Sequence, residues 1–133
     1  MRTAIVHYCF YESPFGEILL AGANDILLLL SLPHGKSHHE PQPHWQHNPH
    51  AFAKCRQQLT EYFAGKRKSF DLEFQVQGTP FQERVLKCVY KIPYGKTKAY
   101  SEIADQIKQP AAIRAVGGAN AKNPIPIIVP CHR

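Results

Sequence analysis

At about Gly78 the sequence changes from mainly strand-like patterns to a run of short helices, and from a neutral to a basic composition. This boundary constrains the fold more than any other feature. Upstream of it, residues 3–10 and 17–23 have the composition of strands, and the turn residues 13–16 separate them. Residues 26–32 form a third apolar run after an Asn-Asp turn. An antiparallel meander is the simplest arrangement of three such strands, so we expect one here.

The rest of the first half predicts a loop, a helix and one more strand. Residues 33–49 are crowded with proline and histidine and have no apolar period, which is typical of a loop. Asn48 and Pro49 suit the N-cap and first position of a helix that ends before Gly65. The apolar face of this helix consists of Phe52, Cys55, Leu59, Tyr62 and Phe63. The alternating strand consists of Phe70, Leu72, Phe74 and Val76. We expect these elements to form a first lobe over residues 1–77.

The second half, residues 78–133, predicts a run of short helices with clear boundaries. Thr79, Pro80 and Gln82 form a capping-box pattern that opens the first helix, and a Pro-Tyr-Gly turn at residues 93–95 ends it. Residues 100–109 predict a second helix, and Pro110 begins a third after a very short turn. Two short helices joined so tightly are typical of a helix-turn-helix.

The third of these helices, residues 110–120, is poor in bulky side chains. Its interior pair Gly117 and Gly118 weakens it by nearly 2 kcal/mol, at about 0.8–1 kcal/mol for each glycine. One explanation is that the helix presses into a narrow groove of a partner, with Arg114 as its long cationic projection. The other is tight packing inside the protein together with a glycine C-cap, and the residues alone do not separate the two.

The formal net charge of +6 is confined to the second half. Residues 1–79 carry seven basic and seven acidic side chains, whereas residues 80–133 carry nine basic and three acidic ones. A basic lobe beside a neutral one indicates a polyanionic partner, and nucleic acid is favoured over membrane because no amphipathic anchor accompanies the charge. A solvated lysine-rich surface is the alternative.

A cysteine between a proline and a histidine lies at the end of the sequence. The apolar residues 125–129 predict an extended buried segment, and Pro130 fixes the backbone just before Cys131. His132 and Arg133 supply a proton acceptor and a cation, which lower a thiol pKa from about 8.5 toward neutral. The pattern indicates a reactive thiol, and a buried structural cysteine is the alternative.

The remaining cysteines and the histidines indicate less strongly which compartment the protein occupies and whether it binds a metal. Four widely spaced cysteines without a C-x-x-C pair indicate reduced thiols and a cytoplasmic protein. The start lacks the apolar core of a signal peptide, and residues 26–30 are too few to cross a membrane. Six histidines in the loop are compatible with zinc, but solvated side chains are favoured and we expect no metal. They are His34, His38, His39, His44, His47 and His50.

Three stretches of the second half, residues 94–100, 114–120 and 123–133, carry a resemblance to a known family. The first is Tyr-Gly-Lys-Thr-Lys-Ala-Tyr, the second Arg-Ala-Val-Gly-Gly-Ala-Asn, and the third runs from Asn-Pro to Pro-Cys-His-Arg. They closely resemble the methylated-DNA-protein-cysteine methyltransferases. The resemblance implies an α/β (α+β) fold with a ribonuclease-H-like antiparallel sheet lobe carrying a helix, followed by a winged helix-turn-helix lobe. It also implies direct DNA repair without a cofactor, by one-turnover transfer of an alkyl group from O(6)-alkylguanine, and from O(4)-alkylthymine, to Cys131.

The resemblance further implies roles for individual residues. Cys131 accepts the alkyl group as a thiolate, and His132 is its base through a water molecule. Arg114 fills the place left by the flipped base, and Tyr100 pushes the adjacent phosphate and hydrogen-bonds that base. Asn123 braces the turn before the active-site segment. The other implied site residues are Ala115, Gly117 and Gly118 along the minor groove, and Pro130 and Arg133 beside the reactive cysteine. The implied partner is double-stranded DNA containing alkylated guanine, bound by a monomer with no membrane involved.

One feature departs from the family pattern. In the family the chain continues beyond Pro-Cys-His-Arg through a pocket-lining loop and a helix with a glutamate that orients the histidine, whereas this sequence stops at Arg133. We therefore expect a second lobe that is incomplete at its C-terminal end, with a carboxylate near Cys131 that opposes thiolate formation. A truncated, inactive homologue that binds DNA or alkylated DNA without alkyl transfer is the main alternative, and metal sensing through the histidine loop is a distant third.

Overall fold

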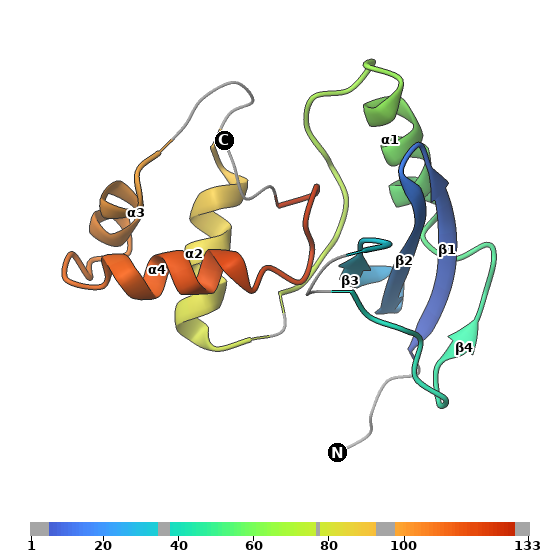
Figure 1. The fold of residues 1–133 in the computed structure, drawn as a ribbon, viewed down its shortest axis with the longest axis horizontal. Coiled ribbons are helices and arrows are strands. Elements are labelled where there is room, and N and C mark those ends of the chain that lie inside the picture. The colour runs from blue at the N-terminus through green and yellow to red at the C-terminus, as the bar shows by residue number, and fades with distance from the viewer. Residues whose placement is uncertain (1–5, 35–37, 77, 93–97, 130–133) are drawn as a thin grey trace. The chain divides into compact units, whose positions relative to one another are not determined.

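The computed structural model describes residues 6–34, 38–76, 78–92 and 98–129 (Figure 1). It contains two compact units, Met1–Gln75 and Val76–Arg133, and each is described by itself. The first unit holds β1 (His7–Ser13), β2 (Gly16–Ala23), β3 (Ile26–Ser31), β4 (Gln46–His47) and α1 (Ala53–Phe63). The second holds α2 (Pro80–Tyr90), α3 (Tyr100–Gln106) and α4 (Ile113–Ala121). The mixture of sheet and helices confirms the predicted α+β class, and no helix among the described residues is long and apolar enough to cross a membrane.

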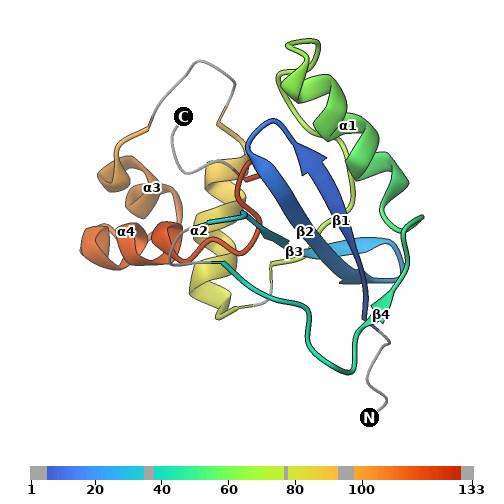
Figure 2. The ribbon, with the colours of Figure 1, turned by 45° about the vertical axis from the view of Figure 1, so that its right-hand side comes forward.

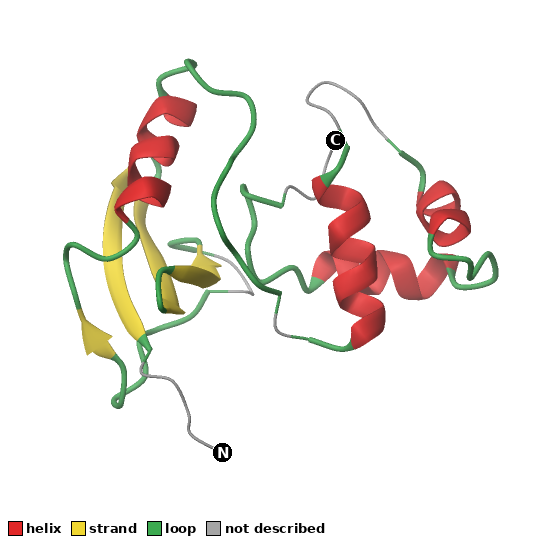
Figure 3. Cartoon of the chain, turned by 180° about the vertical axis from the view of Figure 1, so that it is seen from behind, coloured by secondary structure: helices red, strands yellow, loops and turns green. Residues whose placement is uncertain are grey.

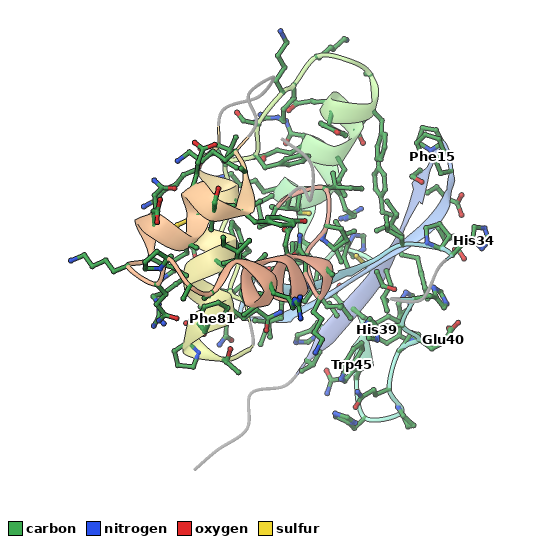
Figure 4. All side chains as sticks on the ribbon, turned by 60° about the vertical axis from the view of Figure 1, so that its left-hand side comes forward. Phe15, His34, His39, Glu40, Trp45 and Phe81 are labelled. Carbon is green, nitrogen blue, oxygen red and sulfur yellow. The ribbon has the colours of Figure 1, made fainter. Side chains whose placement is uncertain are left out.

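The sheet of the first unit has the strand order β3-β2-β1-β4, and β1, β2 and β3 form the predicted antiparallel meander (Figure 2). The turn between β1 and β2 is stabilised by Ser13, whose Oγ accepts from the Phe15 N–H at 3.1 Å and donates to the Gly16 carbonyl at 2.6 Å. Gly16 has φ of 123°, which favours glycine. Phe15 projects from the tip of this hairpin and is 76% exposed (Figure 4).

Residues 33–49 were expected to form a loop throughout, and this was wrong for Gln46 and His47, which form the short strand β4. β4 pairs in parallel with β1, because the Gln46 N–H donates to the Val6 carbonyl and the Asn48 N–H to the Tyr8 carbonyl, both at 2.8 Å. A two-residue strand carries no alternating pattern that periodicity could detect.

Helix α1 begins at Ala53, four residues later than the predicted first position Pro49. The side chain of Asn48 accepts from the His50 N–H at 3.0 Å, and its carbonyl accepts from the Ala51 N–H at 3.0 Å, so Asn48 forms a separate turn. Phe52 then takes the left-handed conformation (φ 57°, ψ 42°) and stands at the N-cap. This backbone costs roughly 1–2 kcal/mol, and burial of the Phe52 ring offsets it.

Helix α1 packs against β1 (Figure 2) through an aromatic and a polar contact. The rings of Tyr11 and Phe63 stack with centroids 6.3 Å apart, and the hydroxyl oxygens of Tyr11 and Thr60 are 3.0 Å apart. The core between helix and sheet is formed by Cys9, Ile18, Leu20, Leu27, Leu30, Phe52, Cys55, Leu59 and Phe70.

The predicted strand at residues 70–76 was largely wrong, because it forms only one parallel bridge, between Phe74 and Leu27. Its predicted alternation of buried and exposed side chains is nevertheless present. The buried amide of Gln58 replaces part of a strand ladder, since it donates to the Asp71 carbonyl at 2.8 Å and accepts from the Asp71 N–H at 2.9 Å. The segment is thus held to α1 by a side chain.

In the second unit, Thr79 caps α2 as predicted, because its Oγ1 accepts from the Gln82 N–H at 3.1 Å. The Gln82 side chain donates instead to the carbonyl of Lys122, the C-cap residue of α4, at 3.2 Å. The capping pattern therefore also ties the start of α2 to the end of α4. The expected Pro-Tyr-Gly stop at residues 93–95 lies outside the described residues.

Helices α3 and α4 form the predicted pair of short helices, and both pack on α2 (Figure 3). Their expected boundaries were too generous. α3 ends at Gln106, because Lys108 turns into the left-handed region (φ 63°) and the Gln109 N–H donates back to the Ala104 carbonyl at 2.9 Å. α4 begins at Ile113 and not at Pro110. The core of the second unit consists of Val85, Leu86, Val89, Ile103, Ala104, Val116, Ala119, Ile125, Ile128 and Val129.

Candidate functional site

The segment after α4 is bound to the second unit by the side chain of Asn123. Asn123 is 7% exposed, its Oδ1 accepts from the Ile125 N–H at 2.9 Å, and its Nδ2 donates to the Val129 carbonyl. One amide thus satisfies a backbone donor and a backbone acceptor four residues apart in sequence. Because Ile125 and Val129 are fully buried, these backbone groups have no access to solvent.

This segment is buried as predicted, but the expectation of an extended strand was wrong. It winds through turns in which the Val129 N–H donates to the Ile125 carbonyl at 2.9 Å, and Ile127 lies in the left-handed region with φ of 74°. Prolines at 124 and 126 cannot donate to a sheet ladder, so a compact turn that uses the Asn123 amide satisfies the backbone better than a strand.

The four residues that follow, Pro130, Cys131, His132 and Arg133, are the predicted reactive group. They lie outside the described residues. The described part of the chain ends at Val129, two positions before Cys131.

The outer face of α4 carries the small residues that the sequence singled out. Arg114, Ala115 and Gly118 are exposed, whereas Val116 and Ala119 are buried in the core. Apart from Arg114 and the exposed Ile113 at the start of the helix, this face carries small side chains.

The two glycines of α4 have different surroundings, and the glycine C-cap of the packing alternative is not formed, because both glycines lie inside the helix and Lys122 is the C-cap residue. A Cβ on Gly117 would stand 3.1 Å from Cε2 of Tyr100, so Gly117 permits close packing between α3 and α4. A Cβ on Gly118 would meet no described atom within 4 Å. Packing inside the protein therefore explains the first glycine and not the second.

Tyr100 is the first residue of α3 and is 42% exposed, although α4 supports its ring. Its hydroxyl lies 3.5 Å from Nδ2 of Asn120, which is only 3% exposed. Sequence reasoning missed Asn120. The available signal was its position four residues after Val116, on the buried face of α4, where an amide requires partners.

The cations of the second unit are not committed to internal ion pairs in the described residues. Both recorded ion pairs, His38 with Glu40 and Arg67 with Glu61, belong to the first unit. The exposed basic side chains of the second unit include Arg84, Lys87, Lys91, Lys108, Arg114 and Lys122. They leave a surface suited to a polyanion.

The cysteines of the first unit are poor nucleophiles. Cys9 is fully buried, its Sγ donates weakly to the Ala51 carbonyl at 3.5 Å, and burial raises its pKa while nearby Arg56 lowers it. Burial raises the pKa of Cys55 to about 12. At neutral pH both remain protonated thiols. In the second unit, Cys88 is half-buried.

The histidine-rich loop does not gather its side chains into a metal site in the described part of the chain. His38 Nε2 lies 2.7 Å from a Glu40 carboxylate oxygen, and its Nδ1 lies 2.8 Å from the Leu32 carbonyl. The carbonyl of Leu32 and the carboxylate of Glu40 raise the pKa of His38. His39 and Trp45 both belong to this loop (Figure 4).

Comparison with known proteins covers both units. Residues 6–76 match the model of the 6-O-methylguanine DNA methyltransferase ribonuclease-like domain, and residues 80–133 match that of the DNA-binding domain of the same proteins. Methylated-DNA–protein-cysteine methyltransferase of Mycobacterium tuberculosis is 47% identical, with 97% of this chain and 78% of that protein covered. The enzyme of the same name from Methanosarcina acetivorans is also 47% identical, with 96% and 82% covered.

A solved structure agrees with these matches. The crystal structure of Mycobacterium tuberculosis OGT in complex with DNA superimposes with a TM-score of 0.86 at 48% identity, covering 96% of this chain and 76% of that one. The predicted ribonuclease-H-like and helix-turn-helix architecture is confirmed by this likeness and by the two domain matches. The chain therefore belongs to the family of methylated-DNA–protein-cysteine methyltransferases.

Proposed function

We propose that this protein repairs DNA by transferring a methyl or larger alkyl group from O(6)-alkylguanine, and from O(4)-alkylthymine, to Sγ of its own Cys131. The observation that carries the proposal is the family match across both units, combined with a Pro-Cys-His-Arg sequence directly after the segment bound by Asn123. The relatives carry the name of this activity.

The reaction is a nucleophilic substitution at carbon. The Cys131 thiolate attacks the alkyl carbon, a C–S bond forms, the C–O bond breaks, and the electron pair leaves with the guanine oxygen. His132, acting through a water molecule, takes the thiol proton before attack, and the departing guanine is protonated to give the normal base. The thioether is stable, so each molecule acts once and needs no cofactor.

The environment of the other thiols supports Cys131 as the acceptor. Cys9 and Cys55 are buried, and burial holds the pKa of each thiol above its ordinary value. An SN2 attack needs a thiolate that the alkyl carbon can approach in line, and neither group offers one. Pro130 and Arg133 flank Cys131 and His132 within the acceptor motif, where the proline restricts the backbone and the arginine favours the anion.

The exposed face of α4 supports DNA binding from the minor groove. Arg114 replaces the flipped base in the stack, and the exposed small residues Ala115 and Gly118 let the helix approach the sugar-phosphate backbone. Gly117 completes this stretch of small residues and leaves room for the Tyr100 ring beside it. Tyr100, half-exposed at the start of α3, contacts the adjacent phosphate and the flipped base. A lesion-repair protein gains from this mode because the minor groove carries little sequence information.

Mass spectrometry tests the proposal directly. The purified chain is incubated with a duplex that contains O(6)-methylguanine, and we expect a gain of about 14 Da on the peptide that contains Cys131. Cys131→Ser is the matched control and gains no mass. Binding of the methylated duplex without any mass gain would favour the inactive DNA-binding homologue instead.

The proposal extends to partner, assembly and compartment. The partner is double-stranded DNA with alkylated guanine, and one monomer acts on one lesion. Four cysteines without a C-x-x-C pair favour a reducing cytoplasm.

A further inference from the structure

Two residues of α4 contact Tyr100 from one side, one at its ring and one at its hydroxyl group. These contacts bear on the position of the ring and on the direction of the hydroxyl proton. Gly117 lies beneath the ring, and an added Cβ would stand 3.1 Å from Cε2 and 3.4 Å from Cδ2. The first distance is shorter than an ordinary contact between carbon atoms, so a larger residue at position 117 would displace the ring by a few tenths of an ångström. Gly117 therefore sets the height of the ring above α4.

Asn120 lies three residues after Gly117, on the same side of the helix. Its Nδ2 donates to the hydroxyl oxygen of Tyr100 at 3.5 Å, and its side chain is almost completely buried. An amide nitrogen can only donate, so the tyrosine oxygen is the acceptor in this contact. The tyrosine proton then remains available for a different acceptor.

We propose that Gly117 and Asn120 are positioning residues for Tyr100: Gly117 fixes the ring, and Asn120 occupies the hydroxyl oxygen as a donor, which directs the hydroxyl proton to DNA. The inference rests on the proposed role of Tyr100 in DNA repair. Phosphate oxygens and base ring nitrogens are both acceptors, and each requires a donor. An acceptor at position 120 would compete with DNA for the same proton.

A spectroscopic test separates this contact from a general structural role. The protein is labelled with 13C at Cζ of its six tyrosines, and the Tyr100 signal is assigned by its absence in Tyr100→Phe. We expect Asn120→Ala to shift the Tyr100 signal and leave the other five in place, because Cζ carries the hydroxyl oxygen. Asn48→Ala removes an amide of the first unit and is the matched control that leaves every second-unit tyrosine signal unchanged. A Tyr100 signal that stays in place in folded Asn120→Ala would overturn the inference.

A double-mutant cycle gives the functional test. We expect Asn120→Ala to slow transfer from alkylated duplex by about threefold to tenfold, the effect of one neutral hydrogen bond. In a Tyr100→Phe background the same substitution should have no further effect, since the hydroxyl is already absent. Asn120→Leu keeps the branched shape of the side chain and serves if Asn120→Ala unfolds.

The outcomes distinguish this inference from the proposed function. An equal loss from Asn120→Ala in the presence and absence of the Tyr100 hydroxyl overturns the positioning role while alkyl transfer stands. A wild-type protein that never gains mass from methylated DNA refutes the proposed function, whereas the Tyr100 signal still reports whether Asn120 binds the hydroxyl.

Discussion

Replacement of Asn123 by alanine tests whether one buried amide holds the segment that leads to Cys131. The substitution removes the donor to the Val129 carbonyl and the acceptor for the Ile125 N–H, both in fully buried residues. Each unsatisfied backbone group costs about 1–3 kcal/mol, so we expect a loss of about 2–5 kcal/mol in the free energy of unfolding. This is a large part of the stability of an ordinary domain.

Urea denaturation followed by circular dichroism measures this loss, and Asn48→Ala is the control. Asn48 also binds a backbone N–H, that of His50 at 3.0 Å, but in an exposed turn where water replaces the lost contact. The control should therefore lose less than about 1 kcal/mol. Equal losses in the two variants would refute the bracing role of Asn123.

Asn123→Asp adds a pH dependence with a definite sign. The carboxylate still accepts from the Ile125 N–H, but only its protonated form can donate to the Val129 carbonyl. Burial and the facing carbonyl favour the protonated form, so the folded-state pKa of this introduced group lies above its unfolded value of about 3.9. The deficit relative to wild type should thus be small below about pH 4 and grow as pH rises. A deficit that does not change with pH would contradict this reasoning.

Three further predictions concern other parts of the chain. Arg114→Ala should reduce alkyl transfer from duplex DNA by at least about tenfold but leave reaction with a free alkylguanine base nearly unchanged, because only duplex requires base flipping; equal losses in single-turnover rates would contradict that role. Gln58→Leu should lower the free energy of unfolding by about 1–3 kcal/mol in urea titrations, since two part-buried hydrogen bonds to Asp71 are lost, and a near-neutral result would show that water replaces the amide. Native iodoacetamide labelling at pH 8, followed by peptide mapping, should leave Cys9 and Cys55 unmodified while Cys131 reacts, because burial raises the pKa of both first-unit thiols; rapid labelling of either would overturn their assignment as inert.

The sequence predicted the elements whose signals are local. The Ser13 turn and the Thr79 cap depend on side chains two or three residues from the backbone groups they bind, and the antiparallel meander pairs strands that follow one another in the sequence, so pattern and structure agree. The small residues on the exposed face of α4 could be recognised from the composition of that segment alone.

The differences arise where distant contacts outweigh local preference. Asn48 has the residue type of an N-cap, but burial of Phe52 places the start of α1 further on. The apolar run 125–129 has the composition of a strand, but Asn123 binds both of its ends and winds it into turns. Asn120 closes the family stretch 114–120, but its contact could not be predicted, because its partner Tyr100 is twenty positions away.

Because the cations that the structure describes in the second unit lack ion-pair partners, the folding of this unit and its binding to DNA should respond in opposite ways to ionic strength. Its cations have no internal carboxylate partners in the described residues, so they repel one another, and added salt should make that unit harder to unfold by screening the repulsion. The same ions compete for the phosphates of DNA, so affinity should fall as salt rises. DNA phosphates and salt ions would thus relieve the same repulsion between cations. A buffer of high ionic strength should therefore stabilise the free protein most and support DNA binding least.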